Sequence, residues 1–426
     1  MSQADRRASI PKRLLGLSNT DAWNCTHAPV DATPWTSQSA IEYGCVQSTL
    51  RKRMNPPPAE IGVPVAEVET PALIIDLDAL DRNIAKMAEF ARAAGVRVRP
   101  HAKTHKSTAI ALRQIALGAV GQCVQKVGEA EVLVRGGVKD VLVSNQVVGE
   151  RKLRRLAALA KEATVALCFD SAEQIDAASR VARDFGVVLG GLVEIEVGME
   201  RCGIAPGRDA ASLARRIAAA PNLKFKGLQA YHGRAQHMTA YQERAQAIAS
   251  AVDAVRETLE ALAAENLPCE IIGGAGTGTF AIEAASGVYN ELQVGSYVFM
   301  DTEYARIRGG DDRPYAEFEH SLFVLASVIS VPAADRAIVD AGLKSYSAER
   351  GPPWVHERLD VEVTGVSDEH GKLKIGPQAR PLSLGEKVWL IPGHCDPTVN
   401  LHDWYVGVRK GRVEALWPIN ARGASI

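Results

Sequence analysis

The chain has 426 residues, of which 49 are Lys or Arg and 50 are Asp or Glu, so its formal net charge is -1. This balance gives no reason to expect a nucleic acid or another polyanion as a partner. The length suits two or three domains, or one barrel with an extra domain. A hydrophobic content of 46% is ordinary for a globular protein and predicts a large buried core.

The cysteines and the apolar segments indicate where the protein resides. The seven cysteines are scattered, and none forms a Cys-x-x-Cys pair, which predicts reduced thiols rather than a disulfide framework. No apolar run reaches the length of about 18 residues that a membrane-spanning helix needs. No signal-peptide hydrophobic region follows Arg6 and Arg7. We expect a soluble cytoplasmic protein without membrane partners.

Residues 1–60 differ in composition from the rest of the chain. They are polar, rich in Ser, Thr, Asn and Pro, and lack a sustained hydrophobic period. Such a composition buries too little apolar surface to offset the entropy lost on ordering. We predict a disordered or loosely docked N-terminal extension.

From Thr70 onward, short apolar strands alternate with amphipathic helices. Strands of this kind pair in parallel and are covered by the helices. The predicted helices include residues 78–94, 153–163, 173–185, 209–219 and 241–265. The predicted strands are residues 72–77, 96–98, 121–124, 141–144, 165–169, 192–197, 227–231 and 271–273. This repetition predicts a (β/α)8 barrel over residues 65–312, with functional groups at the C-terminal ends of its strands.

The remaining residues, 313–426, have a different pattern. Short β-rich runs alternate with Gly, Pro and Asp turns, and long helical patterns are absent. The runs are residues 323–330, 336–340, 359–363, 387–391 and 404–408. We predict a separate C-terminal all-β domain.

The segment 96–106 ends a predicted strand with a lysine at its mouth. Arg97 and Arg99 alternate with valines as in a half-buried strand, and Pro100 cannot continue a hydrogen-bonded ladder. Neighbouring cations and partial burial both lower the pKa of an amine, so Lys103 could act as a nucleophile or Schiff-base former. The alternative is a basic strand end that is solvated or binds an anion.

A glycine-rich run, residues 273–278, follows the last predicted barrel strand. Backbone N–H groups without side-chain obstruction can bind a phosphate, although a tight turn needs no ligand. Phosphate sites recur after the final strands of such barrels. A lysine after one strand and a phosphate loop after another predict pyridoxal 5'-phosphate (PLP), bound covalently to Lys103 and anchored by its phosphate.

A second informative stretch contains His394, Cys395 and Asp396. In an extended segment the histidine and the aspartate point to one side, and Cys395 points away. Imidazole plus carboxylate, with water or substrate oxygen at the open positions, suits Mn²⁺ or Mg²⁺, with Zn²⁺ as a further option. In another register Cys395 replaces Asp396. The alternative is a polar turn before the final strands.

Three further polar residues have two interpretations each. Arg201 follows Glu194 and Glu196, and it either pairs with them or donates to an anionic phenolate oxygen of a cofactor. Tyr231 and His237 are either packing groups or candidates for acid-base chemistry.

Several motifs occur in order between about residues 65 and 424. They are Arg99-Pro100-His101-x-Lys103, Val197-Gly198-x-x-Arg201-Cys202-Gly203, Gln229-Ala230-Tyr231-His232-Gly233, Gly274-x-Gly276-Thr277-Gly278, Gly295-Ser296-Tyr297 and Pro392-Gly393-His394-x-Asp396. Together they resemble the D-threonine aldolase and D-serine dehydratase family. The resemblance implies the alanine-racemase-like fold (fold type III), a PLP-binding barrel followed by a C-terminal β domain, and it implies a homodimer.

The resemblance also implies a role for each site residue. Lys103 would bind PLP covalently, Arg201 would lie near its O3′ and Tyr231 along its ring. The residues around its phosphate would be Gly274, Gly276, Thr277 and Ser296. His394 and Asp396 would bind the metal, and His237 would be the base near the substrate's β-hydroxyl. Ala275 stands where the family usually has a glycine, which strains the loop only if its φ is positive.

Within the family, the second metal residue separates two activities. The dehydratase branch resembles His-x-Cys and the aldolases resemble His-x-Asp, so Asp396 favours an aldolase. The substrate would be a D-3-hydroxy amino acid of the D-threonine or 3-hydroxy-D-aspartate type, cleaved to glycine and an aldehyde. The alternatives are a D-serine or 3-hydroxyaspartate dehydratase, an amino-acid racemase, and a non-enzymatic PLP carrier. The carrier class lacks the C-terminal domain and the metal pair.

Overall fold

The computed structural model describes residues 55–426, so the prediction for residues 1–54 lies outside the described part of the chain. One of its two sheets consists of parallel strands in the order β2-β9-β8-β7-β6-β5-β4-β3, and a parallel bridge from His101 to Cys123 joins its two ends. The strands are β2 (Arg97–Val98), β3 (Gln122–Val124), β4 (Asp140–Gln146), β5 (Thr164–Phe169), β6 (Leu189–Glu194), β7 (Leu223–Gln229), β8 (Ile271–Gly274) and β9 (Glu291–Leu292). The predicted (β/α)8 barrel is therefore confirmed.

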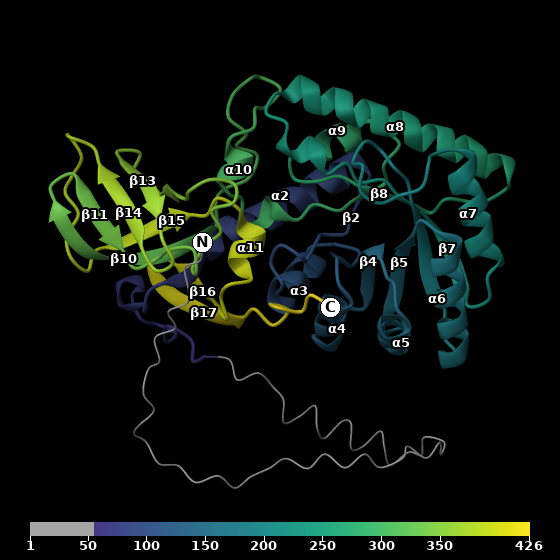
Figure 1. Cartoon of the computed structure of the whole chain (residues 1–426), viewed down its shortest axis with the longest axis horizontal. Helices are drawn as coiled ribbons and strands as arrows, with labels where there is room; N and C mark the ends of the chain where they lie inside the picture. Colours follow the sequence, from purple (N-terminus) through teal and green to yellow (C-terminus); the bar gives the residue numbers. More distant parts are fainter. Residues whose placement is uncertain (1–54) are drawn as a thin grey trace, which may run out of the picture. The chain divides into compact units, whose positions relative to one another are not determined.

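Helices cover the outside of this barrel (Figure 1). They are α2 (Leu77–Ala94), α3 (Thr108–Ala116), α4 (Val127–Arg135), α5 (Glu150–Leu159), α6 (Ala172–Phe185), α7 (Arg208–Ala219), α8 (Tyr241–Ala264) and the short α9 (Phe280–Ala285). Helix α2 shows how the sequence determines where a helix begins and ends. The Asp76 carboxylate accepts hydrogen bonds from two N–H groups of the first turn, and Gly95 ends the helix at a φ of 68°. None of the helices in residues 55–426 is both long and apolar enough to cross a membrane.

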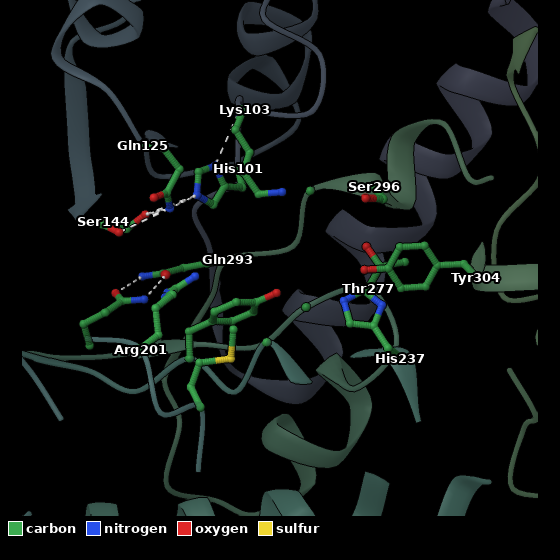
Figure 2. Close-up of a pocket in the computed structure, with 16 residues that line it drawn as sticks. His101, Lys103, Gln125, Ser144, Arg201, His237, Thr277, Gln293, Ser296 and Tyr304 are labelled. Carbon is green, nitrogen blue, oxygen red and sulfur yellow. Dashed lines mark hydrogen bonds between the residues drawn. The ribbon is translucent and has the colours of Figure 1, made fainter. Parts of the chain in front are cut away.

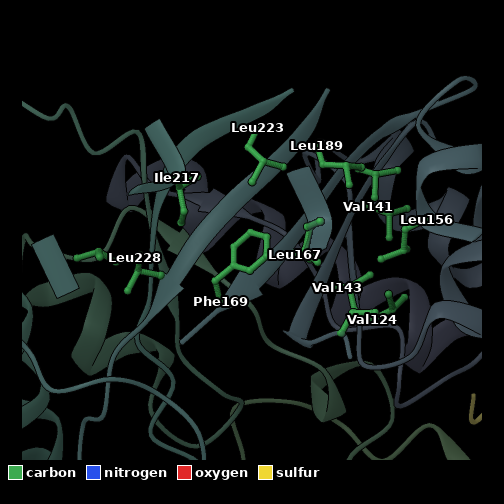
Figure 3. Packing of buried hydrophobic residues seen from close by; sticks show 14 of the residues in the cluster. Val124, Val141, Val143, Leu156, Leu167, Phe169, Leu189, Ile217, Leu223 and Leu228 are labelled. Carbon is green, nitrogen blue, oxygen red and sulfur yellow. The ribbon is translucent and has the colours of Figure 1, made fainter. Parts of the chain in front are cut away.

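The barrel core lies between the strands and the helices. Val143 of β4 and Leu167 of β5 belong to the same buried cluster as Leu156 of α5 (Figure 3). Fully burying a side chain of this kind contributes roughly 1.5–3 kcal/mol. Inside the barrel, polar side chains such as Gln229 and Gln293 are buried near the C-terminal strand ends, where they donate hydrogen bonds to each other. Polar side chains therefore occupy the interior of the barrel at this end.

The second sheet contains the predicted C-terminal strands. Its path is β13-β14-β11-β10-β1-β16-β17, with β15 paired to β10 and β12 paired to β15. The strands are β1 (Ala72–Asp76), β10 (Leu322–Ala333), β11 (Arg336–Val339), β12 (Trp354–Val355), β13 (Val361–Val366), β14 (Gly371–Ile375), β15 (Lys387–Ile391), β16 (Trp404–Arg409) and β17 (Arg412–Pro418). The short helices η3 (Ser296–Val298), α10 (Thr302–Ala305) and α11 (Cys395–Val399) lie in the connections.

The assignment of residues 72–77 as the first barrel strand is wrong. β1 pairs antiparallel with β10 and parallel with β16, so it is an inner strand of the second sheet. The missing barrel strand is β9, which has two residues and was not predicted. An apolar strand followed by a helix has the same sequence pattern in either sheet. The glycine-rich loop after β8 consequently follows the seventh barrel strand, which remains a usual place for a phosphate site.

The placement of β1 can be tested by mutation. Ile74 is fully buried in this strand, so Ile74→Ala is expected to lower the free energy of unfolding by roughly 2–5 kcal/mol, measured by urea denaturation. Ile329→Ala is the control, because Ile329 of β10 is 46% exposed; its effect should stay within about 0.5 kcal/mol. Equal small effects for both variants would contradict the position of β1.

Candidate active site

One cavity opens at the C-terminal ends of the barrel strands (Figure 2). Its volume is about 320 Å³. Of the predicted site residues, its lining includes Lys103, Arg201, Tyr231, His237, Gly276, Thr277 and Ser296. It also includes residues for which no individual role was predicted, among them His101, Gln125, Ser144, Gln293 and Tyr304. Gln125 and Ser144 follow predicted strands, which is the signal that could have identified them.

Lys103 lies at the edge of this cavity in an ion pair with the Asp396 carboxylate. Burial lowers the pKa of the Lys103 amine, but Asp396 and the Tyr231 phenol raise it, and the net pKa lies above its ordinary value. The expectation of a lowered pKa is therefore wrong for the protein without bound ligands. The sequence shows the neighbouring cations of the same segment, but it does not show that the fold brings the Asp396 carboxylate of α11 to Lys103.

His101 provides an uncharged aromatic surface beside Lys103. Its Nδ1 accepts a hydrogen bond from the Lys103 N–H at 3.3 Å, and its Nε2 lies 3.2 Å from the Ser144 hydroxyl. Burial, and next the positive charge of Lys103, hold the pKa of His101 well below its usual range, so the ring is neutral. A neutral ring of this kind can stack on a planar heteroaromatic group.

The glycine-rich loop after β8 carries a buried, unsatisfied hydroxyl group in the wall of the cavity. Gln236 fixes the loop, because its side chain accepts from the Gly278 N–H at 2.9 Å and donates to the Thr279 hydroxyl at 2.8 Å. Thr277 is 1% exposed, and its Oγ1 has no hydrogen-bond partner within residues 55–426. Buried polar atoms are rarely left unpaired. The Thr277 hydroxyl and the adjoining loop therefore fit an anionic group such as a phosphate.

The structure shows the backbone conformation of Ala275 and the surroundings of Gly274, two points that the sequence left open. Ala275 has a φ of 69°, so this residue adopts the left-handed conformation that glycine accommodates better. Gly274 does not line the cavity: a Cβ there would come within 2.7 Å of the Ala230 carbonyl oxygen and of the Tyr289 ring. Gly274 is thus required by close packing beneath the loop, and the predicted contact with the phosphate is not supported by its position.

The structure pairs Arg201 with one of its two predicted carboxylate partners, Glu194, and also places it at the cavity. It lines the cavity, and its Nη2 lies 3.7 Å from a carboxylate oxygen of Glu194. The other oxygen of Glu194 accepts a hydrogen bond from Gln146 at 2.7 Å. Burial raises the pKa of Glu194, although Gln146 and Arg201 oppose this shift. Glu196 instead accepts hydrogen bonds from the backbone N–H groups of Gly198 and Met199 in its own turn.

Of the two predicted metal residues, Asp396 contacts Lys103, and neither lies in an extended segment. His394 is the N-cap of α11, and Asp396 belongs to its first turn, so the expected extended geometry is wrong. Pro397 is compatible with this helix because proline is tolerated in a first turn. Burial raises the pKa of Asp396, but Lys103 and His394 lower it, and the net pKa lies below its usual range. The carboxylate is therefore ionised.

Further contacts define this region. The Nδ1 of His394 lies 2.5 Å from a carboxylate oxygen of Glu349. Cys395 is fully buried; its N–H donates to the Asp301 carboxylate at 3.0 Å, and its thiol lies 3.6 Å from a carboxylate oxygen of Asp396. Within residues 55–426, no group of three or more His, Cys, Asp and Glu side chains is arranged to hold a metal ion. His394 and Asp396 thus form a pair rather than a complete set of ligands.

The comparisons with known proteins first define a class. A family model described as "Alanine racemase, N-terminal domain" matches residues 75–303, and one described as "Putative serine dehydratase domain" matches residues 321–408. The chain therefore has the alanine-racemase-like architecture that its motifs predicted.

Three relatives then specify the family. The chain is 48% identical to the 3-hydroxy-D-aspartate aldolase of Paracoccus denitrificans (strain Pd 1222) over 370 residues, 86% of this chain and 95% of that protein. It is 45% identical to the D-threonine aldolase of Arthrobacter sp. over 379 residues, 89% of this chain and 99% of that protein. The crystal structure of D-threonine aldolase from Filomicrobium marinum superposes with a TM-score of 0.85 at 47% identity, covering 87% of this chain and 100% of that chain.

The chain belongs to the family of D-threonine aldolases and 3-hydroxy-D-aspartate aldolases. It is accordingly an aldolase, a carbon–carbon lyase, and the predicted family and enzyme class are confirmed.

Proposed function

We propose that this aldolase cleaves D-3-hydroxy amino acids into glycine and an aldehyde, with PLP on Lys103 and a divalent metal ion on His394 and Asp396. The observation that carries the proposal is the direct contact between Lys103 and Asp396 at the cavity edge. This contact joins the lysine of the barrel to a predicted metal ligand of α11, in the connection between β15 and β16.

The residues around the cavity fit PLP. Lys103 supplies the amine, neutral His101 a surface for the ring, and Thr277 a buried hydroxyl without a partner in the described protein. Arg201, Tyr231 and Ser296 line the same space. When bound, PLP withdraws electrons from the substrate's Cα and so stabilises the negative charge that remains there after C–C cleavage.

The pair His394 and Asp396 fits a hard divalent ion better than a closed zinc site. One imidazole and one carboxylate leave several positions for water or substrate oxygens, which Mn²⁺ and Mg²⁺ accept. A structural zinc site would need four protein ligands. A divalent ion held here supplies Lewis-acid chemistry that lowers the pKa of a hydroxyl group.

The chain's own residues divide the remaining tasks. His237 lines the cavity and is the candidate base for the proton of the substrate's β-hydroxyl. Arg201, which pairs with Glu194, would donate to the anionic phenolate oxygen of the cofactor.

The natural substrate is D-threonine, 3-hydroxy-D-aspartate or a close analogue. Cleavage of D-threonine gives glycine and acetaldehyde, and cleavage of 3-hydroxy-D-aspartate gives glycine and glyoxylate. The names of the similar proteins include both preferences. We also propose a homodimer and a cytoplasmic location, which light scattering and cell fractionation would test.

The activity can be tested by product analysis. Purified protein with PLP and Mn²⁺ would receive D-threonine, L-threonine, D-serine and 3-hydroxy-D-aspartate separately. Glycine plus an aldehyde from the D-hydroxy acids alone would support the proposal. Pyruvate or oxaloacetate released with ammonia would instead support the alternative, a dehydratase.

The phosphate contact predicts opposite effects on stability and on affinity. Thr277→Val removes a buried hydroxyl that has no partner within residues 55–426, so the free energy of unfolding of the protein without PLP should be unchanged within about 1 kcal/mol or rise. The affinity for PLP, measured by fluorescence titration, should fall about 10-fold or more, the value of a hydrogen bond to a charged group. Thr164→Val, at an exposed position of β5, is the control. Unchanged PLP affinity would contradict the contact.

A further inference from the structure

A glutamate that the sequence did not single out lies directly behind His237. His237 ends the 3-10 helix η2 (Arg234–His237), and Glu303 belongs to α10. The Nδ1 of His237 lies 2.6 Å from a carboxylate oxygen of Glu303. His237 also lines the cavity, together with Thr277 and Tyr304, and Figure 2 labels all three. With Nδ1 turned to the carboxylate, Nε2 is the ring nitrogen left for the cavity.

The Glu303 carboxylate is protected from solvent and ionised. Its side chain is 13% exposed, whereas that of His237 is 41% exposed. Burial raises the pKa of Glu303, but the hydrogen bond and charge of His237, the guanidinium of Arg350 and the imidazole of His394 lower it, and the net pKa lies below its ordinary value. Arg350 Nε lies 3.4 Å from the same carboxylate oxygen. The carboxylate is thus held by two partners, one from η2 and one from the loop before β12.

We infer that Glu303 is a positioning residue for the cleavage reaction, which holds His237 with its proton on Nδ1 and with Nε2 free to accept the proton of the substrate's β-hydroxyl. This inference rests on the proposed role of His237 as the base. A carboxylate on one ring nitrogen fixes the tautomer of a catalytic histidine and stabilises the imidazolium that forms.

The proton and electron changes balance without another reactant. The β-hydroxyl O–H bond breaks and its proton goes to Nε2 of His237. The electron pair of that O–H bond forms the aldehyde C=O bond, and the Cα–Cβ pair stays on Cα. One proton must then reach Cα to give glycine, and the proton held by His237, returned directly or through solvent exchange, supplies it and restores the neutral imidazole. Glu303 keeps its charge throughout, because it accepts the Nδ1–H hydrogen bond without taking the proton.

The test compares variants of the holoenzyme loaded with PLP and Mn²⁺, on whichever of D-threonine and 3-hydroxy-D-aspartate the wild type cleaves. Glu303→Ala should lower kcat about 10- to 100-fold, part of the 10²–10⁴-fold that a general base contributes, and leave KM within about twofold. Glu303→Gln should lose less, because its amide oxygen can still accept from Nδ1–H. Glu200→Gln is the matched control: Glu200 pairs with Arg234 on the same helix η2, and its side chain is 78% exposed.

A double-mutant cycle separates positioning from a structural role. In a His237→Asn background, Glu303→Ala should cause no further loss of kcat, and the melting temperature and PLP content should stay those of His237→Asn. A further loss equal to that in the wild-type background would overturn the inference. If Glu303→Ala kept the wild-type kcat while His237→Asn was impaired, the inference about Glu303 would be overturned, but the assignment of His237 as the base would stand. Wild-type kcat in His237→Asn would overturn the assignment of the base, and this inference with it.

Discussion

Replacing Lys103 by alanine is expected to abolish turnover, with kcat reduced by roughly 10³-fold or more, as for other residues that form a covalent bond in catalysis. The side chain is the amine at the cavity edge, and no other lysine lines the cavity in the described residues. The visible absorbance of covalently bound PLP should disappear, and PLP should be removable by dialysis. Both are measured by spectrophotometry and steady-state assays.

The control for this variant is Lys152→Ala, an exposed lysine of α5. It should keep both the absorbance and the activity. Retention of dialysis-resistant PLP by Lys103→Ala would show that another residue binds the cofactor. The fold of Lys103→Ala must be checked by circular dichroism, since the substitution removes the ion-pair partner of Asp396.

Removing the divalent ion is expected to have the second largest effect. Chelation by EDTA should lower kcat about 10²-fold or more, because the loss of Lewis-acid assistance removes several kcal/mol of transition-state stabilisation. Adding Mn²⁺ should restore the activity. In Asp396→Asn one of two predicted ligands loses its charge, and the Mn²⁺ concentration for half-maximal activity should rise at least about 10-fold.

Asp335→Asn provides the comparison for the metal experiment. Asp335 is an exposed aspartate in the turn between β10 and β11, so its variant should have the Mn²⁺ dependence of the wild type. Full activity of the wild type after exhaustive chelation would contradict a role for the metal. If Asp396→Asn needed the same Mn²⁺ concentration as the wild type, the enzyme would still depend on the metal, but Asp396 would not be one of its ligands.

The sequence predicted several helix ends well because end signals are local, although the helix predicted over residues 153–163 spans Glu150–Leu159. The predicted helix 78–94 differs from α2 by one residue, since Asp76 and Gly95 mark its two ends. The strands were harder. β9 has two residues, too few to show a period, and β1 is an apolar strand whose partners are decided by tertiary packing. A single-chain pattern defines a strand but not the sheet to which it belongs.

The site residues that lie in recognisable motifs could be predicted from the sequence. Lys103 and Thr277 were found from motifs at the ends of predicted strands and Ser296 from the family resemblance, and the structure brings all three to one cavity. Glu303 and Glu349 were missed, because each lies outside a recognisable motif and contacts its histidine only through the fold. The proximity of Asp396 to Lys103 was likewise invisible, since the two residues are 293 positions apart.

The position of β1 has a consequence for how such chains can be recombined. Because β1 precedes the barrel but lies between β10 and β16, the second sheet is encoded by two stretches of the gene that flank the barrel. A fragment that ends after the barrel would carry an apolar strand with both hydrogen-bonding edges unpaired, and such edges promote aggregation. Exchange of C-terminal segments between related aldolases would preserve folding only if β1 were exchanged with them.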